Sequence, residues 1–264
     1  MPTYRDRAVV LRTHKLGEAD RIVTLLTRYN GKVRAVARGV RRPSSKFGGR
    51  LEPCSHVDVQ FVRGRNLDII AQVETVAGYS RPLRDDYARF TAGEVMLETV
   101  DRLVAEEGDP ALRQYRLLVG ALHALGRGTS DGKRPPALIL DSFLLRSLAI
   151  AGYAPALAVC ARCGAECPQV WFSATSGGLV CPSCRPSGAR RLEASTWTLL
   201  GALMAGDWLS TRGVTQSDSE MAHRVIGDFV NWQLEHSLRS LPLLDTGDGA
   251  LADDEDPGRQ ASDV

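Results

Sequence analysis

Residues 20–40 read DRIVTLLTRYNGKVRAVARGV and predict a β-hairpin. Both arms are rich in β-branched and apolar residues, which is typical of strands. Between the arms, Asn30 and Gly31 form the dipeptide that best accepts the positive φ angles of a tight hairpin turn.

The second arm of this hairpin has two different faces, because successive side chains of a strand point to opposite sides. Its apolar set is Val33, Ala35 and Ala37. Its basic set is Lys32, Arg34 and Arg38. We therefore expect one face of this strand to belong to the core and the other to carry positive charge.

Similar stretches predict further strands within the first 80 residues, and no long helical stripe interrupts them. The five expected strands are Arg7–His14, Asp20–Tyr29, Lys32–Val40, His56–Val62 and Leu67–Ala77. Five strands in this length suit a small β-barrel. The loop 39–50, GVRRPSSKFGGR, is expected to be exposed and mobile.

Charge is distributed unevenly along the chain. The formal net charge is +2, yet residues 1–65 carry +10 and residues 245–264 carry −6. An isolated basic loop is often merely solvated, but here basic residues precede and follow it, which favours contact with phosphates. The predicted nucleic-acid contacts are Lys32, Arg34, Arg38, Arg41, Arg42, Lys46, Arg50, Arg63 and Arg65. Tyr29 and Phe47 are the aromatic residues expected near this surface, where each could stack on a base or belong to the core.

After Pro82 the apolar spacing becomes helical. Helices are expected in residues 81–155 and again in 191–244, and together these two parts form a helical domain. Ser217 and Glu220 predict a capping box for the last helix. Met221, Val225, Phe229 and Trp232 are spaced to share one face of that helix. The tail 245–264, rich in Asp, Gly and Ser, is predicted to be disordered.

Two Cys-x-x-Cys pairs interrupt the helical domain, at Cys160 and Cys163 and at Cys181 and Cys184. Their spacing is typical of a four-cysteine zinc site, which would leave no open position for water and would make one Zn²⁺ structural. The segment between the pairs predicts a β-hairpin, so residues 156–190 are expected to form a zinc ribbon. Four unligated buried cysteines are the alternative.

Two other cysteines are assigned no ligand role. Cys167 belongs to no pair and is expected to be a bystander, and Cys54 is expected to be a small buried apolar residue. A thioredoxin-like redox role would need a βαβ setting around one pair, which this segment lacks.

No catalytic motif accompanies the scattered histidines, and no Walker loop is present. Glu18 and Asp20 could pair on a metal ion, but roles in a turn and in solvent contact explain them more simply. The longest apolar run, near 138–151, is interrupted by polar residues, so it predicts no membrane span. The N-terminus predicts no signal peptide, and we expect a cytoplasmic protein.

The run 17–65, GEADRIVTLLTRYNGKVRAVARGVRRPSSKFGGRLEPCSHVDVQFVRGR, is followed by helices, a CxxC…CxxC insertion and further helices. In this order, over roughly residues 3–244, the chain resembles the bacterial RecO recombination-mediator family. The resemblance implies an α+β multi-domain fold: an N-terminal OB-fold β-barrel in residues 1–80, then an α-helical domain with an inserted four-cysteine zinc ribbon.

The resemblance also implies a function in DNA repair and homologous recombination. The protein would bind single- and double-stranded DNA and anneal complementary strands coated with single-strand-binding protein. With RecR it would promote loading of RecA. The acidic C-terminal tail of the single-strand-binding protein would dock on the helical domain, at residues that the resemblance does not identify. The expected location is the cytoplasm, at the nucleoid, and no enzymatic activity is implied.

Two other functions remain open from the sequence. One is an OB-fold nuclease that depends on a metal ion, and the other is an RNA-binding zinc-ribbon factor. The acidic tail departs from the family pattern, and it is either solvated or a competitor of DNA for the basic face.

Overall fold

The predicted hairpin is part of a closed five-stranded barrel in the computed structural model, which describes residues 2–79, 83, 85–166 and 170–234. The barrel strands are β1 (Thr3–Leu16), β2 (Asp20–Thr27), β3 (Lys32–Ala37), β4 (Ser55–Val62) and β5 (Asp68–Gly78). Their order is β1-β2-β3-β5-β4, with β3 and β5 parallel and β4 paired to β1. This topology is the expected OB-fold.

The β2–β3 hairpin ends each strand earlier than the sequence predicted. Both the backbone N–H and the hydroxyl of Thr27 donate to the Gly31 carbonyl, at 2.8 Å each, which closes a turn before Tyr29. Gly31 adopts a φ of +61°, as the Asn-Gly signal indicated. The strand after it stops at Ala37 instead of Val40.

The alternation predicted for β3 is confirmed on its inner face. Val33, Ala35 and Ala37 lie in the barrel core, opposite Leu25 and Val23 of β2. Phe47 is also buried there, at 2% exposed, so of the two candidate aromatics this one is a core residue. The loop 39–50 is thus exposed through its basic residues but anchored to the barrel by Phe47.

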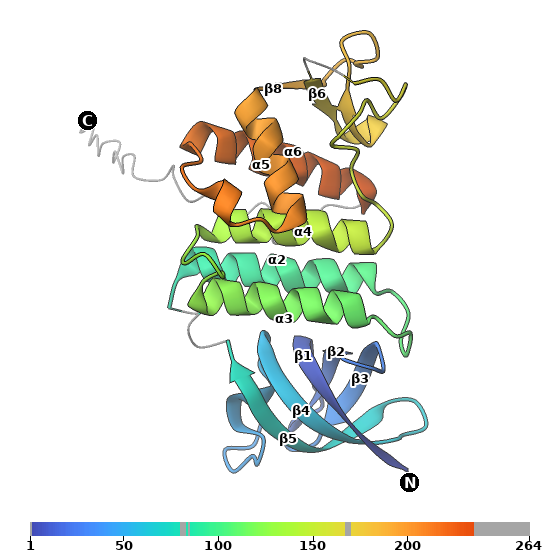
Figure 1. Ribbon diagram of the computed structural model, residues 1–264. Helices are drawn as coiled ribbons and strands as arrows, with labels where there is room; N and C mark the ends of the chain where they lie inside the picture. The colour runs from blue at the N-terminus through green and yellow to red at the C-terminus, as the bar shows by residue number, and fades with distance from the viewer. Residues whose placement is uncertain (1, 80–82, 84, 167–169, 235–264) are drawn as a thin grey trace, which may run out of the picture.

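The described residues form five α-helices beyond the barrel, and α2 and α3 lie next to it (Figure 1). They are α2 (Tyr87–Leu103), α3 (Leu112–Arg127), α4 (Pro136–Ile150), α5 (Ala194–Ala205) and α6 (Gln216–Gln233). α4 packs against each of the other four, and every residue from Leu138 to Leu145 is buried, so burial covers all sides of this helix. It is the centre of the helical core.

The capping box predicted for α6 is wrong. Thr215 is the N-cap, and its hydroxyl accepts a hydrogen bond from the Asp218 N–H at 3.1 Å. The helix therefore begins one residue before Ser217. The Asp218 carboxylate also has partners in another helix, because Ser195 and Thr196 at the start of α5 donate to it. The face predicted for α6 is buried at Val225 and Phe229, whereas Trp232 is 55% exposed.

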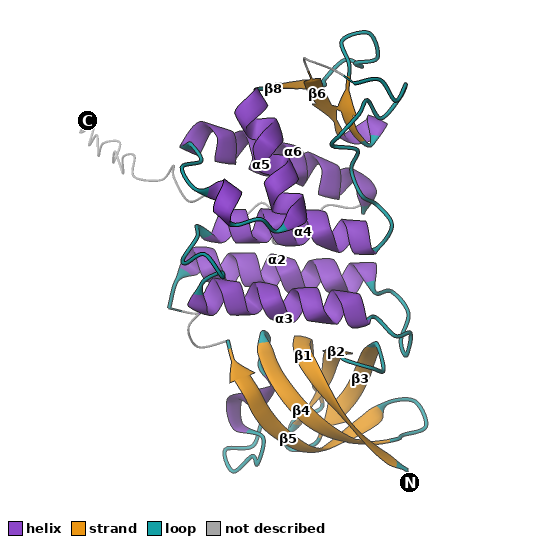
Figure 2. Cartoon of the chain, viewed as in Figure 1, coloured by secondary structure: helices purple, strands orange, loops and turns teal. Residues whose placement is uncertain are grey.

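A small sheet lies at the end of the molecule opposite the barrel (Figure 2). It contains β6 (Val170–Ser173), β7 (Gly178–Val180) and β8 (Arg190–Leu192), in the order β7-β6-β8. The β6–β7 pair is the hairpin predicted between the two cysteine pairs, while β8 was not predicted. The predictions for Cys167 and for the tail 245–264 lie outside the described residues.

Candidate metal centre and nucleic-acid interface

The four paired cysteines converge beside the small sheet. The Sγ atoms of Cys160, Cys163, Cys181 and Cys184 all lie within 4.8 Å of one another. The Sγ atoms of Cys163 and Cys181 are 3.9 Å apart, close to the ~3.8 Å edge of a tetrahedron with metal–sulfur bonds of about 2.3 Å. The four cysteines could therefore hold one metal ion, and thiolate ligands suit Zn²⁺.

Two tight turns aim these side chains at one point. In the first, the Gly164 N–H donates to the Cys160 carbonyl at 2.8 Å, and Gly164 has a φ of +74°. In the second, the Cys184 N–H donates to the Cys181 carbonyl at 3.1 Å. The Cys181 N–H also points at the Cys160 sulfur, 3.4 Å away, which links the two turns.

The crowded thiols have strongly different acidities. Backbone N–H groups of Cys163 and Cys181 lower the pKa of Cys160 to about 6. Hydrogen bonds with the neighbouring thiols Cys181 and Cys163 raise the pKa of Cys184 to about 12. Burial opposes ionisation of Cys181, but hydrogen bonds with Cys184 outweigh it and lower the pKa of Cys181. Thiolates are thus favoured at Cys160 and Cys181, whereas the Cys184 thiol resists ionisation. A bound cation would remove this resistance, because thiolates are the form that ligates metal.

The metal centre is attached to the helical core through the small sheet. Cys160, Trp171 and Val180 form a buried cluster beside the ligands. On the other face of the sheet, Phe172 packs edge-on against Phe229 of α6, with ring centroids 5.9 Å apart. The centre therefore supports the packing of this end of the chain, at the opposite end from the barrel (Figure 1).

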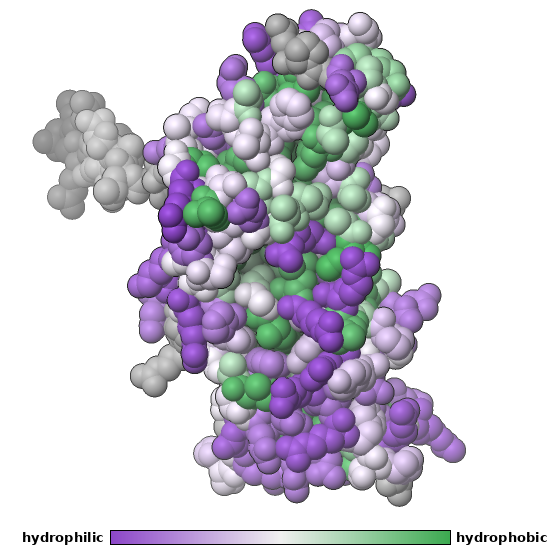
Figure 3. All heavy atoms as spheres, in the orientation of Figure 1, coloured by the Kyte–Doolittle hydropathy of each residue, from purple (hydrophilic) through white to green (hydrophobic). Residues whose placement is uncertain are grey.

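Eight of the nine predicted DNA contacts are exposed on the barrel, where hydrophilic side chains dominate the visible face in Figure 3. The β3 end and the loop after it carry Arg38, Arg41, Arg42, Lys46 and Arg50. The β4–β5 loop carries Arg63 and Arg65, and β3 carries Arg34. The loop bearing Lys46 is tied down, since the Lys46 ammonium donates to the Ala71 carbonyl at 2.9 Å.

Lys32 differs from the others because it is buried, at 8% exposed. Its ammonium donates to the backbone carbonyl of Asp101 at 2.9 Å and lies 3.3 Å from the carboxylate of the same residue. Alternation along β3 places Lys32 on the outer face, as predicted, but the end of α2 covers that point. Lys32 thus links the barrel to the helical domain and leaves little of its side chain exposed.

An acidic segment, residues 101–109, lies along the outer face of the barrel. Glu107 forms an ion pair with Arg34, and its backbone bridges to Gly31 and Lys32. Asp101 pairs with Arg12 as well as Lys32, with 2.6 Å between Arg12 Nε and the carboxylate. Several basic groups on this face are therefore already neutralised by the helical domain.

Arg12 and His14 belong to the same outer face but were not among the predicted contacts. Strand register places Arg12 beside Thr24 and Thr24 beside Arg34, so one row crosses three strands. OB-folds commonly bind oligonucleotides on the face of strands 2 and 3 and the adjoining loops. Alternation along β1 would have placed them with the core residues Ala8 and Val10, because a register shift between Val10 and Arg12 is what turns them outward.

A small polar pocket opens between the β2–β3 turn, the β4–β5 loop and the acidic segment, and we call it the barrel pocket. Its volume is about 270 Å³. Its lining includes Lys32, Arg34 and Arg63, which the structure therefore brings together, with Tyr4, Asn66, Asp68 and Glu107.

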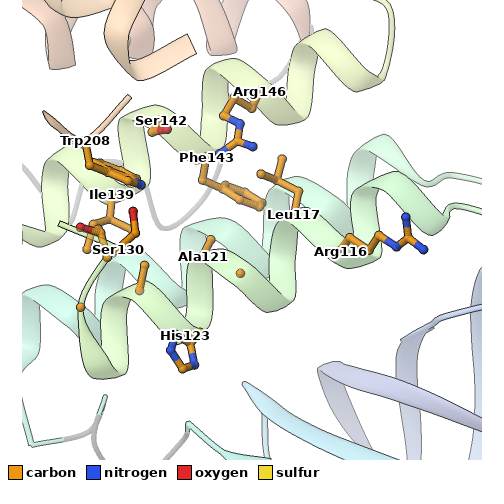
Figure 4. A pocket seen from close by; sticks show the side chains of 14 residues that line it. Arg116, Leu117, Ala121, His123, Ser130, Ile139, Ser142, Phe143, Arg146 and Trp208 are labelled. Carbon is orange, nitrogen blue, oxygen red and sulfur yellow. The ribbon is translucent and has the colours of Figure 1, made fainter. Parts of the chain in front are cut away.

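A second pocket, the α3–α4 pocket, lies in the helical domain and has a volume of about 250 Å³. Figure 4 shows Arg146, Phe143 and Leu117 gathered where α3 and α4 run side by side, with Trp208 farther along. Arg116 also lines it. Apolar walls and two guanidinium groups suit a ligand that combines apolar side chains with negative charge.

Glu18 and Asp20 have the turn roles expected of them. Asp20 accepts a hydrogen bond from the Gly39 N–H at 2.7 Å, and the Glu18 carbonyl accepts from Arg41 at 2.9 Å. Within the described ranges, the four cysteines are the one cluster of three or more metal-ligating side chains. None of the described helices combines the length and the apolar character needed to span a membrane.

Comparison with known proteins agrees with the fold. Residues 1–79 match the family model "Recombination protein O N terminal", and residues 84–242 match "Recombination protein O C terminal". The DNA repair protein RecO of Cutibacterium acnes is 56% identical over 93% of this chain and all of its own length. The RecO proteins of Nocardioides sp. and Thermobifida fusca are 52% and 49% identical, over 92% and 93% of this chain and 99% of their own lengths. The chain belongs to the RecO family of DNA repair proteins.

Proposed function

We propose that this chain is a recombination mediator that binds single- and double-stranded DNA on its barrel without cleaving it. The observation that carries the proposal is the set of eight exposed basic residues distributed around one OB barrel. Such a surface follows a phosphate backbone and does not read bases, which is what annealing requires. In the cell this protein would act at the nucleoid.

In this proposal the protein anneals complementary strands coated with single-strand-binding protein and joins RecR to promote RecA loading. The test is strand annealing with coated DNA. A variant with Arg38, Arg41, Arg42 and Lys46 changed to Glu should anneal far more slowly. Because phosphate contacts release counterions, its residual binding should also depend less steeply on salt.

A matched control changes four exposed basic residues of the helical domain, Arg113, Arg127, Lys133 and Arg224, to Glu. This variant has the same net charge as the barrel variant. Equal annealing by the two variants would show that total charge, and not the barrel surface, governs DNA binding.

The competing functions have direct tests of their own. Cleavage of labelled single strands with Mg²⁺ or Mn²⁺, lost on mutation of Glu18 and Asp20, would support a nuclease. Preference for RNA in direct competition with DNA of the same length would support an RNA-binding factor. We expect neither result.

The α3–α4 pocket is the site we propose for the acidic tail of the single-strand-binding protein. Its two guanidinium groups match a negatively charged peptide, and Phe143 and Leu117 offer apolar contact. Arg146→Glu should abolish binding of a peptide that carries the acidic tail of the single-strand-binding protein. Fluorescence anisotropy of the labelled peptide measures this binding. A peptide whose terminal carboxylate is amidated is the matched control on the ligand side. Unchanged peptide affinity in Arg146→Glu would place the tail elsewhere.

We propose that the ion held by the cysteines is Zn²⁺ and that it supports folding more than DNA contact. The distance of the metal centre from the barrel supports this division. Metal analysis of the purified protein, with one zinc expected per chain, tests the identity of the ion.

A further inference from the structure

The barrel pocket contains a layered stack that ends in a guanidinium group. The ring of Tyr4 is stacked on Phe61, with centroids 4.9 Å apart and planes inclined by 19°. The Arg63 guanidinium lies over the Tyr4 ring, 4.9 Å from its centroid. Phe61 is fully buried, whereas Arg63 is exposed, so the stack runs from the barrel core to the pocket surface.

Asp68 holds the stack in place. One of its carboxylate oxygens accepts from the Tyr4 hydroxyl at 2.5 Å, and the other accepts from the Gly64 N–H at 3.1 Å. Burial, reinforced by Asp68, raises the pKa of Tyr4, so the hydroxyl stays a donor. A Cβ at Gly64 would lie 1.9 Å from the Leu67 carbonyl oxygen, so the tight β4–β5 loop needs a glycine there. The pocket wall is thus ordered before any ligand arrives.

Two of the remaining lining groups match parts of a nucleotide, whereas Arg34 at the rim is already paired with Glu107. The Asn66 amide is exposed and provides both a donor and an acceptor, which can bond the polar edge of a base. A guanidinium plane is a surface on which an unstacked base can stack. The volume of about 270 Å³ suits a single base.

We propose that the barrel pocket takes one unstacked base of single-stranded DNA, stacked on Arg63 and bonded by Asn66. The inference rests on the proposed DNA-binding function and adds a subsite that distinguishes strands. A duplex cannot fill the pocket, because its bases are stacked and paired. The other basic residues contact phosphates, which both forms of DNA have, so this pocket supplies a preference for single strands.

The chain offers a matched control in the same loop. Arg65 is exposed like Arg63 but does not line the pocket. Mutation of either residue to Ala removes one positive charge. Arg63→Ala and Arg65→Ala are compared for affinity to a thymidine oligonucleotide, to a duplex, and to a chain of abasic nucleotides with the same number of phosphates. Thermal unfolding of both variants checks that each remains folded.

Wild-type protein should bind the thymidine oligonucleotide about tenfold more tightly than the abasic chain, since stacking of one base contributes an effect of this size. Arg63→Ala should lose most of this difference, and Asn66→Ala should lose part of it. Arg65→Ala should keep it, while both arginine variants lose the same small factor on the duplex.

Equal retention of the base-dependent difference by Arg63→Ala and Arg65→Ala would overturn the pocket and leave DNA binding by the barrel intact. Absence of binding to all three ligands by the wild-type protein would overturn the proposed function and the pocket together. These two failures are therefore distinguishable in one set of titrations.

Discussion

The two ends of this molecule carry sites of opposite character. At one end, four cysteines from two short turns point at a single centre, where a bound metal ion would depend on each of them. At the other end, exposed basic residues are distributed over several strands and loops of a barrel, so each would contribute only a part of the proposed DNA affinity. A local site is recognisable from residue spacing, whereas a distributed surface depends on what the rest of the fold covers.

The largest effect is expected at the metal end. Cys181→Ser should abolish metal binding and unfold the small sheet, because structural zinc contributes roughly 10–16 kcal/mol of apparent folding energy in small metal domains. Metal content and thermal unfolding measure the loss. DNA affinity of the folded fraction should be retained. A well-folded variant without metal that selectively loses DNA binding would reverse the division between the two ends.

A second test breaks the contact between the barrel and the helical domain. At Gly31 the φ is +61°, and a Cβ would lie 1.9 Å from the Asp109 carbonyl oxygen. Gly31→Ala should therefore cost at least about 2 kcal/mol of unfolding free energy, from backbone strain and steric overlap. Denaturant unfolding measures it. Gly17→Ala, with a φ of +57° and no atom within 4 Å of the added Cβ, is the control for strain alone.

A smaller effect is expected where the acidic segment meets the basic face. Glu107→Gln removes the partner of Arg34 and should raise DNA affinity about two- to fivefold at low salt, the range expected for an exposed ion pair. Glu106→Gln removes the same charge at the neighbouring exposed position and should raise DNA affinity less than Glu107→Gln does. Equal affinities for both variants would mean that Glu107 does not limit the DNA surface.

The smallest effect concerns the pH dependence of the seam between barrel and helices. His56 is buried and shares a 2.7 Å hydrogen bond with the Tyr115 hydroxyl. Burial, followed by the charge of Arg7, lowers the pKa of His56 below its ordinary value of 6.5. The unfolded chain then binds a proton that the folded chain does not, so stability falls as pH drops below 6.5.

His56→Gln should make that fall shallower, at the cost of some stability at neutral pH. Thermal unfolding at a series of pH values measures both quantities. An unchanged pH dependence in the variant would assign the fall to other groups.

Much of the fold could be predicted from local patterns. The Asn-Gly turn, the alternation along β3 and the β6–β7 hairpin each depend on neighbouring residues, and each was found. The predicted capping box failed because Thr215 and Asp218 form a competing local cap that starts the helix earlier. The strand β8 pairs with β6 across a segment that includes β7, which no short-range signal indicates.

The sequence by itself determined the two cysteine pairs of the candidate metal centre, because the spacing within each short turn is set by nearby backbone. It also determined that the barrel end is basic, because charge is a property of composition. Only the tertiary structure decided which of those charges are open. Lys32 is covered by Asp101, far along the chain. Arg12 joins the outer face through strand register, and Arg63 reaches the barrel pocket through its contact with Tyr4. The exposure of a side chain depends on long-range packing, so it cannot be inferred from the order of residues along a strand.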